Sequence, residues 1–92
     1  MRERTVENYL TRRVKEAGGK SYKWCSPSNR SVPDRIAFLP NGGVWFIEVK
    51  SPTGKLTQLQ EHTVKELKKY TDNVVVVFSK EDVQEWLLLA TQ

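Results

Sequence analysis

Two carboxylates and a lysine near the middle of the sequence have the types and spacing of a hydrolytic site. Asp34 follows a proline, and Glu48 and Lys50 flank Val49. If residues 44–49 form a strand, Glu48 and Lys50 project from one face and Val49 from the other, because successive side chains of a strand alternate. A hairpin that pairs this strand with one beginning at Asp34 would place the two carboxylates side by side.

The chemistry that suits such a pair is metal-assisted hydrolysis. Neighbouring carboxylates in a partly buried position repel each other unless a cation joins them. Mg²⁺ prefers carboxylate, carbonyl and water oxygens, and it commonly uses one or two carboxylates together with substrate phosphate. A lysine beside the ion can orient or deprotonate a water and stabilise charge on a phosphate under attack. Asp34, Glu48 and Lys50 together therefore indicate phosphodiester hydrolysis.

An ordinary structural interpretation competes with this one. Glu-x-Lys on a strand is a common surface ion pair, and Pro-Asp before a strand is ordinary turn chemistry. The flanking apolar runs 36–39 and 44–47 favour the functional interpretation, because they read as core strands. Polar residues at the end of a core strand lie where α/β folds tend to place ligand sites.

The surrounding pattern predicts the elements that position these residues, in the order α-β-β-β-α-β-α. Helices are expected before Gly18-Gly19, over about 57–70, and from the Ser79 cap to about Ala90. Strands are expected over 21–25, 34–39, 44–49 and 73–78. The helix between the last two strands is the crossover that parallel pairing requires. We therefore expect one α/β domain over residues 1–92, with a mixed central sheet and helices on both faces.

Composition excludes several classes of protein. The 92 residues contain 15 Lys and Arg against 11 Asp and Glu, which gives a net charge of +4. The longest apolar runs, 74–78 and 86–90, are far too short to cross a bilayer, and the N-terminus has no apolar signal region. One cysteine and one histidine exclude a disulfide scaffold and a structural zinc site. We expect a cytoplasmic, mildly basic protein with no membrane partner.

Two motifs carry a resemblance to a known family. Pro33-Asp34 and Glu48-Val49-Lys50 match the PD-(D/E)xK pattern of the restriction-endonuclease-like nucleases. With V-P-D-R, F-I-E-V-K-S-P-x-G-K-L-T-x-x-Q and V-V-V-F-S, the sequence resembles the virus-type replication-repair nuclease (VRR-NUC) domain in its small, stand-alone, phage-like form. The resemblance covers essentially the whole chain. It implies a restriction-endonuclease-like core and a Mg²⁺- or Mn²⁺-dependent deoxyribonuclease with no small-molecule cofactor, phage-encoded and acting in the host cytoplasm.

The resemblance also implies roles for individual residues. Asp34 and Glu48 would ligate the metal together with the backbone carbonyl of Val49, and Lys50 would be the catalytic lysine. Gln60 matches the glutamine that follows the ExK strand, and it would take part in the catalytic site. One-metal and two-metal hydrolysis both fit this set.

Gln60 has a structural interpretation as well. It shares a helical face with Val64 and Leu67 and should point inward, toward the site. It is also the partner of Thr57 in a capping box, and the two roles are compatible. Leu59, Thr63 and Tyr70 complete the stripe that we expect to face inward.

The first helix offers two candidates for a further metal ligand. Glu3 and Glu7 are four residues apart and so share a face. Glu7 lies on the side of Leu10 and Val14, which favours it over Glu3, although Glu3 fits the E-x-x-aliphatic pattern of the virus-type family. Either could also be a solvated glutamate that interacts with the helix dipole.

Loop cations flank the motif and are expected to contact DNA phosphates: Arg30, Arg35 and Lys55. Two remaining polar residues are given structural roles. His62 is expected on the surface of its helix, and Cys25 is expected to be a small buried residue at a strand end.

The leading hypothesis is a structure-selective DNA endonuclease, because the sequence shows no element that would read bases. A small core, and a last helix with more apolar residues than one stripe requires, predict a homodimer with two sites. That arrangement suits branched DNA such as four-way (Holliday) junctions. The alternatives are a flap-cutting DNA repair nuclease and a non-catalytic nucleic-acid-binding module on the same fold.

Overall fold

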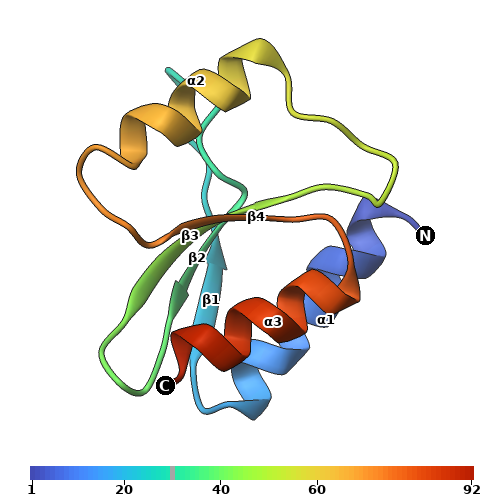
Figure 1. Ribbon diagram of the computed structural model, residues 1–92, viewed down its shortest axis with the longest axis vertical. Helices are drawn as coiled ribbons and strands as arrows, with labels where there is room; N and C mark the ends of the chain where they lie inside the picture. The colour runs from blue at the N-terminus through green and yellow to red at the C-terminus, as the bar shows by residue number, and fades with distance from the viewer. Residues whose placement is uncertain (30) are drawn as a thin grey trace.

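A computed structural model describes residues 1–29 and 31–92 and shows a four-stranded mixed sheet between helices (Figure 1). The expected order α-β-β-β-α-β-α is confirmed. The elements are α1 (Glu3–Glu16), β1 (Lys20–Lys23), β2 (Arg35–Phe38), β3 (Val44–Val49), α2 (Gln58–Leu67), β4 (Val74–Val77) and α3 (Lys80–Ala90).

The sheet has the strand order β1-β2-β3-β4. The first three strands pair antiparallel, and β4 pairs parallel with β3 after the α2 crossover. The β2–β3 hairpin turns at Gly42, whose φ of +88° lies in the left-handed region that favours glycine. These connections place the start of β2 beside the end of β3, where the motif residues lie.

One face of the sheet is sealed by α1 and α3. The helices contribute apolar stripes that include Val6, Leu10 and Val14 from α1 and Val83 from α3, all 0% exposed. They pack on side chains of β2, β3 and β4: Ala37, Ile47, Val49 and Val77. Each fully buried aliphatic side chain contributes roughly 1.5–3 kcal/mol, so this layer supplies most of the stability of the domain.

The other face is covered at one end by α2, which begins at an intact capping box. The Thr57 hydroxyl accepts from the Gln60 backbone N–H at 3.1 Å, and the Gln60 side-chain oxygen accepts from the Thr57 N–H at 3.0 Å. The helix ends at Leu67, short of the expected Tyr70. Tyr70 therefore lies outside the helix.

Two side chains of the expected inward stripe of α2 point to solvent instead. Leu59 is 58% exposed and Tyr70 is 80% exposed, so this prediction was wrong for both. The helix is attached through Thr63 and Val64, which are buried, and the Thr63 hydroxyl hydrogen-bonds the Ser31 hydroxyl. Because α2 covers a polar end of the sheet, it has less apolar surface to bury than its periodicity suggests.

The expectation of a buried Cys25 was also wrong. The thiol residue is exposed, because β1 ends at Lys23 and leaves Cys25 beyond the sheet. His62 is exposed on α2, as expected. Within residues 1–29 and 31–92, no helix combines the length and apolarity needed to cross a bilayer.

Candidate active site

Strand register brings the two motif carboxylates opposite each other. Arg35 pairs with Ile47, so Asp34, one residue earlier, faces Glu48, one residue later. Glu48 in turn pairs with Val76 of β4, and the Trp24 N–H donates to the Asp34 carbonyl at 2.8 Å. We call these four residues the site row: Trp24, Asp34, Glu48 and Val76.

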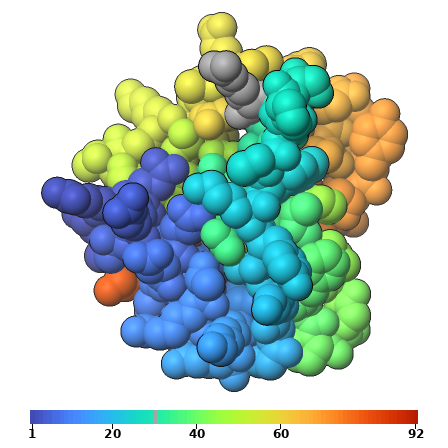
Figure 2. Space-filling view, turned by 180° about the vertical axis from the view of Figure 1, so that it is seen from behind, coloured from blue at the N-terminus to red at the C-terminus, as the bar shows by residue number. Residues whose placement is uncertain are grey.

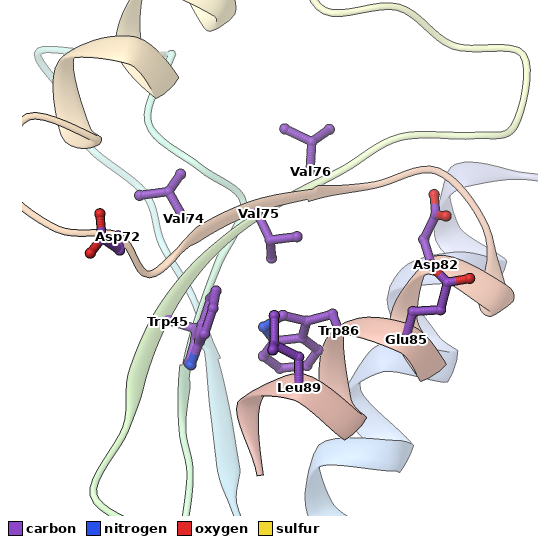
Figure 3. A pocket seen from close by; sticks show the side chains of 9 residues that line it. All are labelled: Trp45, Asp72, Val74, Val75, Val76, Asp82, Glu85, Trp86 and Leu89. Atoms are coloured by element: carbon purple, nitrogen blue, oxygen red, sulfur yellow. The ribbon is translucent and has the colours of Figure 1, made fainter. Parts of the chain in front are cut away.

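The site row lies on the face that α2 covers. Figure 3 shows Val75 directed toward Trp45 and α3, whereas Val76 points to the opposite side of the sheet. Strand alternation puts Glu48 and Lys50 on that side too, and Val49 in the core. The sheet therefore separates the polar residues of the motif from the apolar layer beneath them.

Glu48 is almost completely enclosed. Its side chain is 2% exposed, and its Oε2 accepts from the Gln60 amide nitrogen at 3.4 Å. Asp34 is held close by, because its Oδ2 accepts from the Val49 backbone N–H at 2.8 Å. The carboxylates are thus positioned by the backbone of β3 and by the first turn of α2.

The electrostatics of this pair are unfavourable without a cation. Burial, then hydrogen bonding to Asp34 and its negative charge, raise the pKa of Glu48 to about 8. Lys50 acts in the opposite direction, and Glu3 adds a further upward contribution. A divalent ion bound between the two carboxyls would favour the charged form of Glu48.

The Gln60 side chain contacts both the helix cap and Glu48. Its backbone N–H and side-chain oxygen complete the capping box, while its side-chain nitrogen reaches Glu48. The inward direction expected from the helical spacing is confirmed. The cap fixes the rotamer that presents the amide to the site.

No protein-family model matches the sequence. A curated protein of Acyrthosiphon pisum secondary endosymbiont phage 1, named "Putative nuclease p44", is 47% identical over 64 residues, which is 67% of this chain and 69% of that protein. A solved structure described as a VRR_NUC domain superposes with a TM-score of 0.87 at 30% identity, covering 94% of each chain. The chain belongs to the VRR_NUC family. The family prediction made from the motifs is confirmed, and with it the coarser functional prediction of a VRR_NUC-type nuclease.

The two glutamates of α1 have different surroundings in this VRR_NUC domain. Glu7 forms an ion pair with Arg35, Oε2 to Nη1 at 3.0 Å, away from the site row. Glu3 lies one turn earlier and its charge acts on Glu48. Figures 1 and 2 both show the start of the chain beside the segment that follows β3. Glu7, which the sequence pattern favours, is thus engaged by Arg35, and which of the two glutamates serves as a further metal ligand stays a prediction.

The Arg35 guanidinium is likewise bound by partners within the protein. Besides Glu7, its guanidinium donates to the Ser21 hydroxyl at 3.2 Å and to the Ser21 carbonyl at 3.4 Å, and its side chain is only 13% exposed. A guanidinium with these partners links α1, β1 and β2. Its surroundings speak for a structural role and not for the phosphate contact expected from the sequence.

The remaining cations of the motif lie at the rim of the site. The Lys50 backbone N–H donates to the Val77 carbonyl at 2.9 Å, which anchors the residue at the end of β4. The Lys50 side chain is half-buried. Lys55 is exposed on the loop between β3 and α2. Arg30, the third expected phosphate ligand, lies outside the described residues.

The donor set fits a hard divalent cation with few protein ligands. Among residues 1–29 and 31–92, no group of three His, Cys, Asp or Glu side chains is close enough to hold a metal ion. Two adjacent carboxylates are present, however, and burial of Glu48 together with the hydrogen bond and negative charge of Asp34 raises the pKa of Glu48. Mg²⁺ commonly binds through one or two carboxylates and keeps several waters, so this pair suits it.

A separate hollow has none of the side chains Asp34, Glu48, Lys50 and Gln60 in its lining. It encloses about 410 Å³ between β4 and α3 and is lined by Trp45, Val75, Trp86 and Leu89 (Figure 3). The two indole rings contact edge to face, with centroids 5.9 Å apart. Its lining carboxylates are Asp72, Asp82 and Glu85, with no lysine or arginine, which makes it unsuited to phosphate.

Proposed function

We propose that this VRR_NUC domain is a Mg²⁺- or Mn²⁺-dependent endonuclease that cuts branched DNA, such as four-way junctions. The observation that carries the proposal is the site row itself, in which Asp34 faces a buried Glu48 with Lys50 on the same strand face. The phage relative named as a nuclease supports the reaction class. The net charge of +4 suits a polyanionic substrate.

Asp34 and Glu48 would hold the ion, with the Val49 carbonyl and Glu3 as further oxygen donors. Bound there, a divalent ion would acidify a water and offset the negative charge of the phosphate. Asp34 can direct one carboxylate oxygen to this task, because its other oxygen is fixed by the Val49 N–H. Glu48 brings its negative charge from the enclosed side of the site.

Lys50 and Gln60 would position the reacting groups. The ammonium of Lys50, which opposes the upward shift of the Glu48 pKa, is close enough to interact with that carboxylate. From the rim it can orient a water and stabilise charge on the phosphate. Gln60 holds the Glu48 carboxylate in one orientation through its amide nitrogen.

We propose further that the domain acts as a homodimer through α3. Leu88 is 70% exposed and Leu89 is 62% exposed, although the buried stripe of α3 is already filled by Val83, Trp86 and Leu87. A two-fold interface on this helix would cover both leucines and place two sites on two strands. A small domain also gains stability from such burial.

A cleavage assay on synthetic DNAs tests the activity. Duplex, flap, splayed and four-way substrates of matched sequence are incubated with Mg²⁺, Mn²⁺ or EDTA. We expect cleavage only with a divalent ion, and the highest rate on the four-way junction. Highest activity on the flap would instead indicate a flap nuclease, and binding without cleavage of any substrate would contradict the enzymatic proposal.

A further inference from the structure

The sheet face that carries the site row continues into two more rows of mainly apolar side chains. Each row lies two residues farther along the strands, about 7 Å at 3.3–3.4 Å per residue. The first consists of Tyr22, Ile36, Phe46 and Val74, and the second of Lys20, Phe38 and Val44. We call the four ring-bearing residues of the three rows the aromatic face: Trp24, Phe46, Tyr22 and Phe38.

The aromatic face is continuous with the site. The Trp24 and Phe46 rings contact each other with centroids 5.5 Å apart, and Trp24 belongs to the site row through its backbone bond to Asp34. The Tyr22 and Phe38 rings meet edge to face with centroids 6.0 Å apart. Phe46 also precedes Glu48 by two residues on β3, so the two side chains project from the same face.

The outer half of the aromatic face is open to solvent. Tyr22 is 54% exposed and Phe38 is 44% exposed, whereas Ala37, which points to the α1 and α3 side, is 0% exposed. Figure 1 shows the reason, because α2 stands over one end of the sheet and the hairpin end extends past it. Two exposed, neighbouring rings beside a polar site offer flat surfaces for a ligand.

The charges around these rings favour a polyanion. The Lys20 ammonium, on the same face of β1, lies 5.7 Å from the centre of the Tyr22 ring. Neither β1 nor β2 contains an aspartate or glutamate. Flat apolar rings beside lysines are the combination by which proteins hold single-stranded nucleic acid, with bases stacked on rings and phosphates near the cations.

We propose that the aromatic face binds unpaired nucleotides next to the bond that is cut, with bases stacked on Tyr22 and Phe38 and phosphates near Lys20. This inference rests on the proposed nuclease function and specifies how the domain holds branched DNA, through nucleotides that are unpaired at the branch point beside the bond that is cut. Rows about 7 Å apart give successive nucleotides a continuous path from the open rings to Asp34 and Glu48.

Binding measurements in EDTA test the proposal without cleavage. Fluorescence anisotropy gives the Kd of a labelled single-stranded oligonucleotide and of a blunt duplex. Tyr22→Ala and Phe38→Ala should each weaken single-strand binding by about 5- to 150-fold, the loss expected for one stacked base. Duplex binding should stay within about twofold, since no ring is offered to a paired base.

Two controls keep the test specific. Tyr22→Phe retains the ring and should bind the single strand like the wild type, and Tyr70→Ala removes an exposed tyrosine elsewhere and should also have no effect. If a variant fails to fold, base stacking can still be measured with the wild-type protein and an oligonucleotide that contains 2-aminopurine. Stacking should quench the fluorescence of 2-aminopurine in the oligonucleotide when it binds.

Several outcomes would overturn the proposal. Unchanged single-strand affinity in both alanine variants would remove the rings from binding, and equal losses on duplex and single strand would make the effect non-specific. Light scattering that shows a dimer in the wild type and a monomer in Tyr22→Ala would assign the face to a second copy of the chain. Failure of the nuclease proposal looks different, because the wild type would then bind the single strand but cut nothing with Mg²⁺ or Mn²⁺.

Discussion

The two faces of the sheet differ in the types of side chain that they carry and in how deeply those side chains are buried. On the side of α1 and α3, helices and strands meet through aliphatic side chains that are almost completely buried. On the side of α2, the same strands present a carboxylate pair at one end and exposed rings at the other. A four-residue strand such as β2 therefore serves both purposes, because alternation sends Ala37 to the core and Ile36 and Phe38 to the open face.

Residues for stability and residues for function therefore lie on opposite faces of one sheet. The closed face can hold the fold while the open face carries side chains that are costly to enclose. Glu48 is the clearest instance, since its carboxyl is buried without a full counter-charge. Changes on the two faces should accordingly alter different measured properties, and the following predictions test this.

The largest effect is expected from the carboxylates. Asp34→Asn and Glu48→Gln each remove a charge that the proposed metal site requires, so cleavage should fall below detection while the circular dichroism spectrum is retained. Mn²⁺ binding by calorimetry should weaken in both variants. A cleavage rate within about tenfold of the wild type, a barrier change of only about 1.4 kcal/mol, would contradict the assignment.

Lys50→Ala should reduce the cleavage rate by about 10²- to 10⁴-fold, the usual contribution of a group that moves or orients a proton. Mn²⁺ affinity should remain near that of the wild type, because an ammonium is not a ligand. The informative control is Lys55→Ala, an exposed lysine of the neighbouring loop that should affect DNA affinity more than the rate. Joint loss of metal binding and activity in Lys50→Ala would show that Lys50 is needed to form the site.

Truncation of matched leucines compares the two sides of the molecule in stability. Leu10→Ala on α1 removes a side chain that is 0% exposed and should cost about 2–5 kcal/mol in the free energy of unfolding. Leu59→Ala on α2 removes one that is 58% exposed and should cost within about 0.5 kcal/mol. Thermal or urea unfolding measures both, and similar losses would mean that α2 is packed as firmly as α1.

The pH dependence of stability should report on Glu48 in the metal-free protein. Its folded-state pKa is raised from 4.5 to about 8, so the folded state binds more protons than the unfolded state between these values. Stability from this group is therefore full below pH 4.5, falls as the pH rises toward 8, and is then constant. Glu48→Gln should flatten this slope in the melting temperature, and an equal slope in the variant would assign the dependence to another group.

A change of oligomeric state is the subtlest expected result. Leu88→Glu places a charge on the exposed side of α3 and should convert a dimer into a monomer, with little change in fold because the native side chain is 70% exposed. Light scattering at micromolar concentration measures this, with Leu59→Glu on α2 as the matched control. A wild-type monomer would contradict the homodimer, and a dimeric Leu88→Glu variant would move the interface elsewhere.

Local patterns predicted the elements well, because caps, turns and periodicity are properties of short segments. The Thr57–Gln60 capping box and the Ser79 cap, which accepts from the Asp82 N–H at 3.1 Å, are where they were expected. The Pro-Asn-Gly-Gly turn also predicted the hairpin of β2 and β3, whose register brings Asp34 opposite Glu48.

The mistaken expectations depended on contacts between distant segments. Periodicity shows which residues of α2 share a face but not how much apolar sheet lies beneath, so Leu59 was placed inside wrongly. The sequence also did not reveal that Arg35 of β2 pairs with Glu7 of α1. The two residues belong to segments that are far apart in the sequence, so the local pattern around neither of them predicts the pair.

The β2–β3 hairpin has a consequence for how the domain folds. Asp34 and Glu48 are brought together by one local turn, whereas Gln60 reaches Glu48, and Lys50 reaches Val77, only when the α2 crossover has returned the chain to β4. Local pairings close smaller loops and so form sooner than crossovers. The repelling carboxylates would therefore meet early in folding, before the amide and the strand that enclose them are in place. A divalent cation would offset this repulsion, so we expect a divalent cation added during refolding to speed formation of the hairpin. The ion would then act on folding before the proposed site can cut DNA.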